Sequence, residues 1–193
     1  MSRRNSFRQP YHLDSGEIST LSREEVALVL RAAEDLITTG GRTLLVKVLR
    51  GSKAQDIRPE HRKNPAYSVW KDLSQKEVSH RVDWSIKNAF LGLEYFGKLP
   101  LLVYLPKGLA IECQTIAAEW FQIAVANGFD ALRGHVSSAP LSTAMAMLDQ
   151  VAEHGKEIGL PILNAWEKVA TKRVRKRINS IRAEWNGSGH RRL

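Results

Sequence analysis

The chain has 193 residues, enough for one or two small domains, and its 43% hydrophobic and 25% charged residues are typical of a globular protein with a sizeable core. No apolar run approaches the roughly 20 residues of a membrane-spanning helix, and the basic N-terminus lacks the apolar stretch of a secretory signal, so we expect a cytoplasmic protein with no membrane partner. A single cysteine, Cys113, excludes an intrachain disulfide and a zinc site built from thiolates.

Charge is distributed unevenly along the chain. The formal net charge of +9 arises from 18 Lys and Arg against 12 Asp and Glu in residues 1–109, 2 against 6 in residues 110–159, and 9 against 2 in residues 160–193. Clustered cations raise the local potential and displace counterions from phosphates. The two basic ends therefore favour a polyanionic partner, although a basic surface that only promotes solubility gives the same composition.

The first predicted helices follow a polar N-terminal segment. Residues 1–18 show no periodicity and are predicted to be disordered. Ser22 and Glu25 have the spacing of a capping box, and apolar residues then recur at helical intervals over residues 26–36. Two glycines end this helix, and a second helix is predicted over residues 42–49.

A third helix and a hairpin come next. Residues 52–70 form a basic connection whose prolines argue against a continuous helix. Ser74 and Glu77 open a second capping box, and the amphipathic helix that follows has a cationic exposed side. Two β-prone runs, LEYF and LLVYL, are separated by a turn at residues 97–100. Three helices followed by two strands predict a winged helix-turn-helix.

Three further helices are predicted in the C-terminal half. One lies within residues 110–133 and ends at Gly128, and another covers residues 141–154. Gly155 and the stretch Gly159-Leu160-Pro161 are expected to separate that helix from the last one.

The last helix is predicted as one continuous element over residues 163–185. Its apolar residues step by three or four and stay on one face. Cations occupy the opposite face, and only Glu167 and Glu184 oppose seven Lys and Arg residues. This pattern favours an acidic or nucleic-acid partner over the alternative, a solvated helix face.

The predicted fold is therefore mainly α with a small β-hairpin: a winged helix-turn-helix followed by a C-terminal helical extension. The predicted domains are residues 19–109 for the winged helix and residues 110–186 for the extension. A disordered tail is expected over residues 187–193.

Three short motifs occur in order: Leu49-Arg50-Gly51-Ser52, Phe90-Leu91 and Pro106-Lys107-Gly108. With these motifs, residues 40–109 resemble the RQC winged-helix domain of RecQ-family DNA helicases. That family has an apolar helix ending in LRGS, a recognition helix ending in GFL or GYL, and a β-wing closed by a turn, to which we match Pro106-Lys107-Gly108. Residues 159–181 resemble the helical extension of the small bacterial stand-alone RQC-minor family, which implies nucleic-acid binding without a helicase motor.

The resemblance implies that Arg50 and Ser52 contact DNA phosphates, as the Arg and Ser of LRGS do in the family. The structural alternative is that Ser52 caps the next turn and Arg50 pairs with an acid such as Asp56. In RecQ helicases a residue at the wing tip can wedge against the terminal base pair, which Phe96 would do here unless it packs on the domain. All candidate nucleic-acid contacts are Arg50, Ser52, Lys53, Lys71, Lys76, Arg81, Lys87, Phe96, Lys98, Lys168, Lys172, Arg175 and Lys176.

The chain also departs from the family. Ala89 replaces the usual Gly, Ser79 stands where the recognition helix has a basic residue, and the zinc module and the P-loop of the motor are absent. The expected function is that of a non-catalytic DNA-binding protein specific for duplex ends, forks or structured sites. The alternatives are an RNA- or ribosome-associated protein and a protein-interaction adaptor of a helicase or repair complex. No catalytic, metal or cofactor motif is found, so we expect no enzyme activity and no cofactor.

Overall fold

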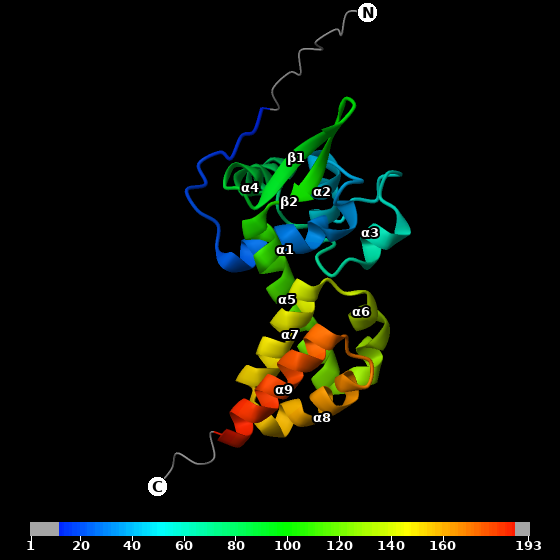
Figure 1. Ribbon diagram of the computed structural model, residues 1–193. Coiled ribbons are helices and arrows are strands. Elements are labelled where there is room, and N and C mark those ends of the chain that lie inside the picture. The colour runs from blue at the N-terminus through cyan, green and yellow to red at the C-terminus, as the bar shows by residue number, and fades with distance from the viewer. Residues whose placement is uncertain (1–11, 188–193) are drawn as a thin grey trace, which may run out of the picture. The chain divides into compact units, whose positions relative to one another are not determined.

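The computed structural model describes residues 12–187, which form two compact units, one ending at Glu112 and the other beginning at Cys113 (Figure 1). The disorder predicted for residues 1–11 and 188–193 concerns parts of the chain outside the described residues. Helix α5 (Pro106–Asn127) begins in the first unit and continues into the second.

The first unit has the predicted order of helices followed by a hairpin. Its elements are α1 (Arg23–Ala33), the 3₁₀ helix η1 (Glu34–Leu36), α2 (Arg42–Leu49), α3 (Pro59–Lys63), α4 (Gln75–Lys87), β1 (Leu91–Phe96) and β2 (Leu99–Tyr104). Helices α1, α2 and α4 bury one face each, so that Leu30, Leu45 and Val82 are all fully buried in one core. With the helices of the second unit, this order confirms the predicted fold class of a winged helix-turn-helix with a helical extension.

Both predicted capping boxes are confirmed. At α1, Ser22 Oγ accepts the Glu25 backbone N–H (3.1 Å), and the Glu25 carboxylate accepts the Ser22 N–H (3.0 Å). Ser74 and Glu77 do the same at α4, with distances of 3.2 and 2.8 Å. Hydrogen bonds from Ser74 lower the pKa of the Glu77 carboxyl group. These local contacts fix where both helices begin.

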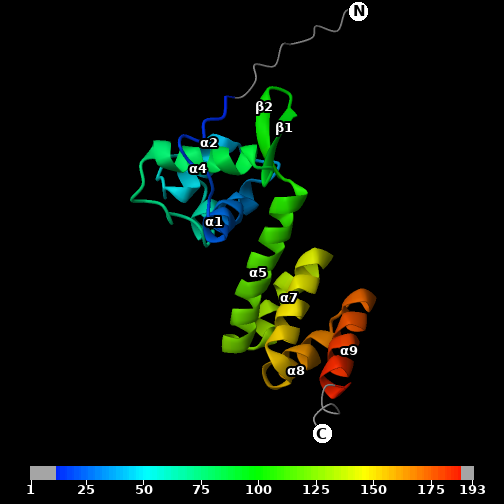
Figure 2. The ribbon, with the colours of Figure 1, turned by 90° about the vertical axis from the view of Figure 1, so that its left-hand side faces the viewer.

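The hairpin is an antiparallel pair that projects from the helices of its unit (Figures 1 and 2). Leu91 pairs with Tyr104 at its base and Phe96 with Leu99 at its tip, so the turn has two residues and not the four predicted. Gly97 adopts a positive φ of 63°, which a two-residue hairpin turn needs and glycine allows without strain.

The first turn of α5 differs from the sequence prediction. Residues 106–108 were expected to form a turn closing the wing, with a helix starting near residue 110. They are instead the first residues of α5, with Pro106 at its start, where a missing N–H costs nothing. Gly108 is buried, and a side chain there would overlap the carbonyl oxygen of Phe90. The glycine therefore lets the helix pack against the base of the wing.

The N-terminal segment also differs from prediction in its described part. Residues 12–18 were predicted to be disordered, but they lie along α4. The Asp14 backbone N–H donates to Asp83 Oδ2 (2.8 Å), and the Trp84 indole N–H donates to the Ser19 carbonyl (3.2 Å). Their partners lie more than sixty residues further along the chain, so a polar composition gave no sign of these contacts.

The second unit consists of helices alone within the described residues. Besides the rest of α5 it contains the 3₁₀ helix η2 (Phe129–Leu132), α6 (Arg133–Ser138), α7 (Leu141–Glu153), α8 (Gly155–Glu167) and α9 (Lys172–Gly187). Its core includes Phe121, Met147 and Leu163.

The prediction of one continuous helix over residues 163–185 is wrong. The chain leaves the helix after Glu167 and starts α9 at Lys172. Lys156 Nζ near the start of α8 donates to Asn186 Oδ1 at the end of α9 (3.0 Å), which makes the two helices antiparallel. Both helices bury their apolar residues in the same core. The apolar spacing of three and four residues therefore continues across the break, and the pattern alone does not reveal that the helix ends.

The expected interruption at Gly159-Leu160-Pro161 is also wrong, because α8 runs through Pro161. The separation from α7 lies at Gly155, whose φ of 84° turns the chain sharply. Pro161 and Glu157 are both exposed, so water can hydrate the carbonyl that lacks an N–H partner.

Gly51→Ala is expected to destabilise the fold more than Gly97→Ala, although both glycines have a positive φ, 67° and 63°. A Cβ at Gly97 meets nothing within 4 Å, so only backbone strain of about 1–2 kcal/mol is expected. At Gly51 a Cβ lies 2.6 Å from Ser68 Cβ, and overpacking adds about 1–3 kcal/mol. Urea unfolding of both variants measures the difference, and Ser68→Gly should recover part of it. Equal costs at the two glycines would contradict this account.

Candidate nucleic-acid interface

The LRGS turn at the end of α2 packs against the segment that leads into α4. The Ser52 N–H donates to the Lys47 carbonyl (2.9 Å) across the left-handed Gly51, which closes the helix C-terminus. The Ser68 N–H donates to the Val48 carbonyl (3.0 Å), and the Trp70 N–H donates to the Leu49 carbonyl (2.9 Å). The end of α2 and the start of α4 are therefore held together. We call Arg50, Ser52 and Lys53 at this turn, together with Lys71 and Lys76 at the start of α4, the basic corner.

A backbone carbonyl just before α4 orients the Arg50 side chain. It is half-buried, and its Nε donates to the Leu73 carbonyl just before α4 (3.1 Å). The alternative pairing with Asp56 is wrong, since Asp56 accepts from Lys47 Nζ (2.6 Å). No hydrogen bond to the two terminal nitrogens of Arg50 is found within residues 12–187. A guanidinium fixed through Nε presents those nitrogens as donors for a planar acceptor such as phosphate.

The other residues of the basic corner differ in the hydrogen bonds and ion pairs that they form within the protein. Ser52 Oγ accepts the Ala54 N–H (3.2 Å), as the structural alternative for Ser52 expects, and its hydroxyl proton is left to donate. Lys53, Lys71 and Lys76 are exposed, and no described carboxylate lies within ion-pair distance of them. The basic corner thus carries a net positive charge that its own residues do not neutralise.

Two predicted contacts on α4 have partners within the protein. Arg81 Nε lies 3.2 Å from Glu25 Oε1, and its guanidinium covers the Trp70 ring at 5.5 Å from the centroid. Arg81 was expected on an exposed cationic face, but it is half-buried and holds α4 to α1. Lys87 is exposed and donates to Ser15 Oγ of the N-terminal segment (3.1 Å). Arg81 Nη1 also donates to the Glu77 carbonyl (3.1 Å), so two of its three nitrogens are engaged within the protein.

The wing tip exposes an apolar pair. Phe96 is 77% exposed and Leu99 is 64% exposed, with Gly97 and the exposed Lys98 between them. The alternative that Phe96 packs on the domain is therefore wrong. Two large apolar side chains facing water at the end of a hairpin have no role in the core of this unit, which points to a binding surface.

In the second unit, acids neutralise only some of the cations near α9. Arg177 pairs with Asp149 and Glu184, both at 2.9 Å, and Arg182 pairs with Glu167 at 2.8 Å. Around the start of α9, the exposed cations without a described carboxylate within ion-pair distance are Lys168, Lys172, Arg173, Arg175 and Lys176. Of these, Arg173 was not among the predicted contacts, because in one continuous helix it fell at the edge of the apolar face.

Apart from Arg81 and Lys87, the predicted contacts fall into three groups that lie on different elements: the basic corner, the wing tip with Lys98, and the start of α9 with Lys168. Among residues 12–187, no group of three or more His, Cys, Asp or Glu side chains is placed to hold a metal ion. None of the helices in that range combines the length and the apolar character needed to cross a bilayer.

Comparison with known families matches residues 22–112, just under half of the chain, to the model of the RQC domain. RQC domains are the nucleic-acid-binding winged-helix domains of RecQ helicases, and they are not catalytic. Searches of curated proteins and of solved structures found no match.

Proposed function

Residues 22–112 form an RQC domain, and from this premise we propose that the chain is a non-catalytic DNA-binding protein that recognises duplex ends, forks or other structured sites. The observation that carries the proposal is the exposed pair Phe96 and Leu99 at the wing tip. A duplex interior offers stacked bases that a side chain cannot reach, whereas an end or a fork exposes a base face. Stacking of an aromatic side chain on such a face contributes roughly 1–3 kcal/mol.

The basic corner supplies the second set of proposed contacts, those with the DNA backbone. Arg50 offers paired donors to a phosphate, Ser52 adds a neutral hydrogen bond, and three lysines add charge. The N–H groups of Gln75 and Lys76 in the first turn of α4 are not taken by the capping box and can donate to an anion beside Lys71 and Lys76. These contacts recognise a sugar-phosphate chain without reading its sequence, so we propose affinity for the shape of a site and not for a base sequence.

A binding panel tests the proposal. The full chain is titrated by fluorescence anisotropy, at one fixed salt concentration, with a forked DNA, a blunt duplex, a duplex closed by loops at both ends, a single strand and an RNA hairpin. The fork and the open duplex should bind most tightly, because only they combine duplex phosphates with an exposed terminal pair. Tightest binding to the RNA would replace the DNA proposal with the alternative of an RNA- or ribosome-associated protein. Failure to bind any nucleic acid would leave the role of a protein adaptor.

Variants in the same panel test the wing-tip contacts and the basic-corner contacts separately. The double variant Phe96→Ala, Leu99→Ala should bind the open ends about 5- to 100-fold less tightly and the closed duplex as before. Ile158→Ala removes another exposed apolar side chain, outside the RQC domain, and serves as the control. Arg50→Ala with Ser52→Ala should weaken binding to every duplex, and unchanged affinity in that variant would remove the phosphate contact assigned to these two residues.

A further inference from the structure

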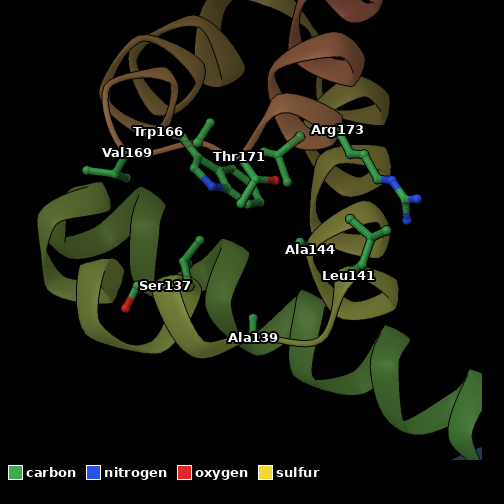
Figure 3. A pocket seen from close by; sticks show the side chains of 11 residues that line it. Ser137, Ala139, Leu141, Ala144, Trp166, Val169, Thr171 and Arg173 are labelled. Atoms are coloured by element: carbon green, nitrogen blue, oxygen red, sulfur yellow. The ribbon is translucent and has the colours of Figure 1, made fainter.

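The second unit contains a pocket that the RQC domain does not explain. Its volume is about 310 Å³, and it lies where the α6–α7 connection faces the α8–α9 turn (Figure 3). Ala139, Leu141 and Ala144 line one side, and Thr171 and Val174 line the other. A pocket at the small end of the usual range of roughly 300–1,000 Å³ has room for one small ring system.

The floor of the pocket carries a polar group that lacks a partner. Trp166 is only 1% exposed, and its ring stacks on Phe129 at 5.4 Å between centroids. Figure 3 shows Trp166 with its indole nitrogen among the residues that line the cavity, and no hydrogen bond from this nitrogen to another residue of 12–187 is found. This nitrogen is open to the cavity, so its N–H can donate to water there or to a ligand that displaces the water.

A cationic depression joins the pocket. Lys172, Arg173, Arg175, Lys176 and Asn179 form a shallow hollow on α9, and Arg173 lines both this hollow and the pocket. Figure 3 shows Arg173 at the rim with its guanidinium directed outward. Cations in the first turn of a helix oppose its dipole and destabilise it. Three cations in that turn, followed by Lys176, with no described carboxylate beside them, therefore favour an anionic ligand and not fold stability.

We propose that this pocket accepts one unpaired base of a single-stranded nucleic acid, with the neighbouring phosphates bound by Arg173 and the other cations of the hollow. A nucleobase is flat, fits a small apolar pocket and carries carbonyl or ring-nitrogen acceptors for the Trp166 indole N–H. A chain of phosphates matches a row of cations that begins at the rim of the pocket. The proposal extends nucleic-acid binding to the helical unit and does not depend on the wing or the basic corner.

The test uses the full chain and a fluorescent four-nucleotide thymidine oligomer, too short to form a duplex. Arg173→Ala should weaken its binding roughly tenfold, as expected for the loss of a charged hydrogen bond. Lys156→Ala removes one cation from the opposite end of the α8–α9 hairpin and should leave binding unchanged. Ala139→Leu fills the pocket without changing the charge and should weaken binding at least about fivefold. Thermal melting followed by circular dichroism confirms that each variant is folded.

The outcomes separate this proposal from the previous one. If Ala139→Leu and Arg173→Ala bind the oligomer as the unchanged protein does, the base pocket is wrong whatever happens at forks. If the oligomer binds through the pocket while forks do not bind, the proposed function of the RQC domain fails and the pocket stands. Displacement of the oligomer by an acidic aromatic peptide at lower concentration than by unlabelled oligomer would assign the pocket to a protein partner and overturn the proposal.

Discussion

Asp83→Ala is expected to lower the free energy of unfolding by about 3 kcal/mol, at the lower end of the roughly 3–5 kcal/mol found when one member of a buried ion pair is removed. Asp83 is fully buried on α4. Its carboxylate accepts from both Nε and a terminal nitrogen of Arg42, the latter at 2.7 Å, and from the Asp14 backbone N–H at 2.8 Å. Loss of the carboxylate leaves these donors unsatisfied, but the Arg42 side chain is 20% exposed and regains some hydration.

A surface ion pair provides the matched control. Asp149 pairs with Arg177 at a similar distance, 2.9 Å, but lies at the surface of the second unit. Asp149→Ala should therefore cost about 0.2–1 kcal/mol. Urea unfolding followed by circular dichroism compares the two variants, and Asp83→Asn shows how much of the loss depends on the charge. A cost for Asp83→Ala no larger than that for Asp149→Ala would contradict the role assigned to the buried carboxylate.

Contacts between residues close in the chain could be predicted from the sequence, and contacts between distant residues could not. Local patterns predicted the capping boxes at Ser22 and Ser74, because both partners of each box lie within three residues. Asp83 and Arg42 are 41 residues apart, and Arg81 and Glu25 are 56 apart, so periodicity on one helix gave no sign of either pair. Arg81 was consequently assigned to the free cationic surface when it is an internal contact.

In the second unit, the break between α8 and α9 could not be predicted from the sequence either. The break between α8 and α9 has no proline or glycine at residues 168–171, and the apolar spacing continues through it. Only the fold shows that the chain reverses there, because both helices need to bury their apolar faces in one core. That reversal brings Arg173 to the rim of the pocket, next to a Trp166 side chain that the sequence presented simply as part of an apolar stripe.

The second large effect is expected in the salt dependence of DNA binding. If the protein contacts about six phosphates, its affinity for a forked DNA should fall roughly 10³-fold between 50 and 200 mM salt. Replacing Arg50, Lys53, Lys71 and Lys76 of the basic corner by alanine removes four of those contacts. Since each contact adds about 0.9 to the slope of log K against log salt, the same change in salt should then reduce affinity only about tenfold.

Substitution of two arginines that already pair with acids provides the control for the salt dependence. Arg58 lies 3.7 Å from Glu60 and Arg133 lies 2.7 Å from Asp130, so Arg58→Ala with Arg133→Ala lowers the net charge without removing a cation from the basic corner. This double variant should keep nearly the full slope, because a phosphate contact releases counterions only where it is made. A slope that falls in both variants in proportion to the charges removed would show that binding follows net charge alone. A slope that falls in the corner variant only would locate the phosphate contacts at the junction of α2 and α4.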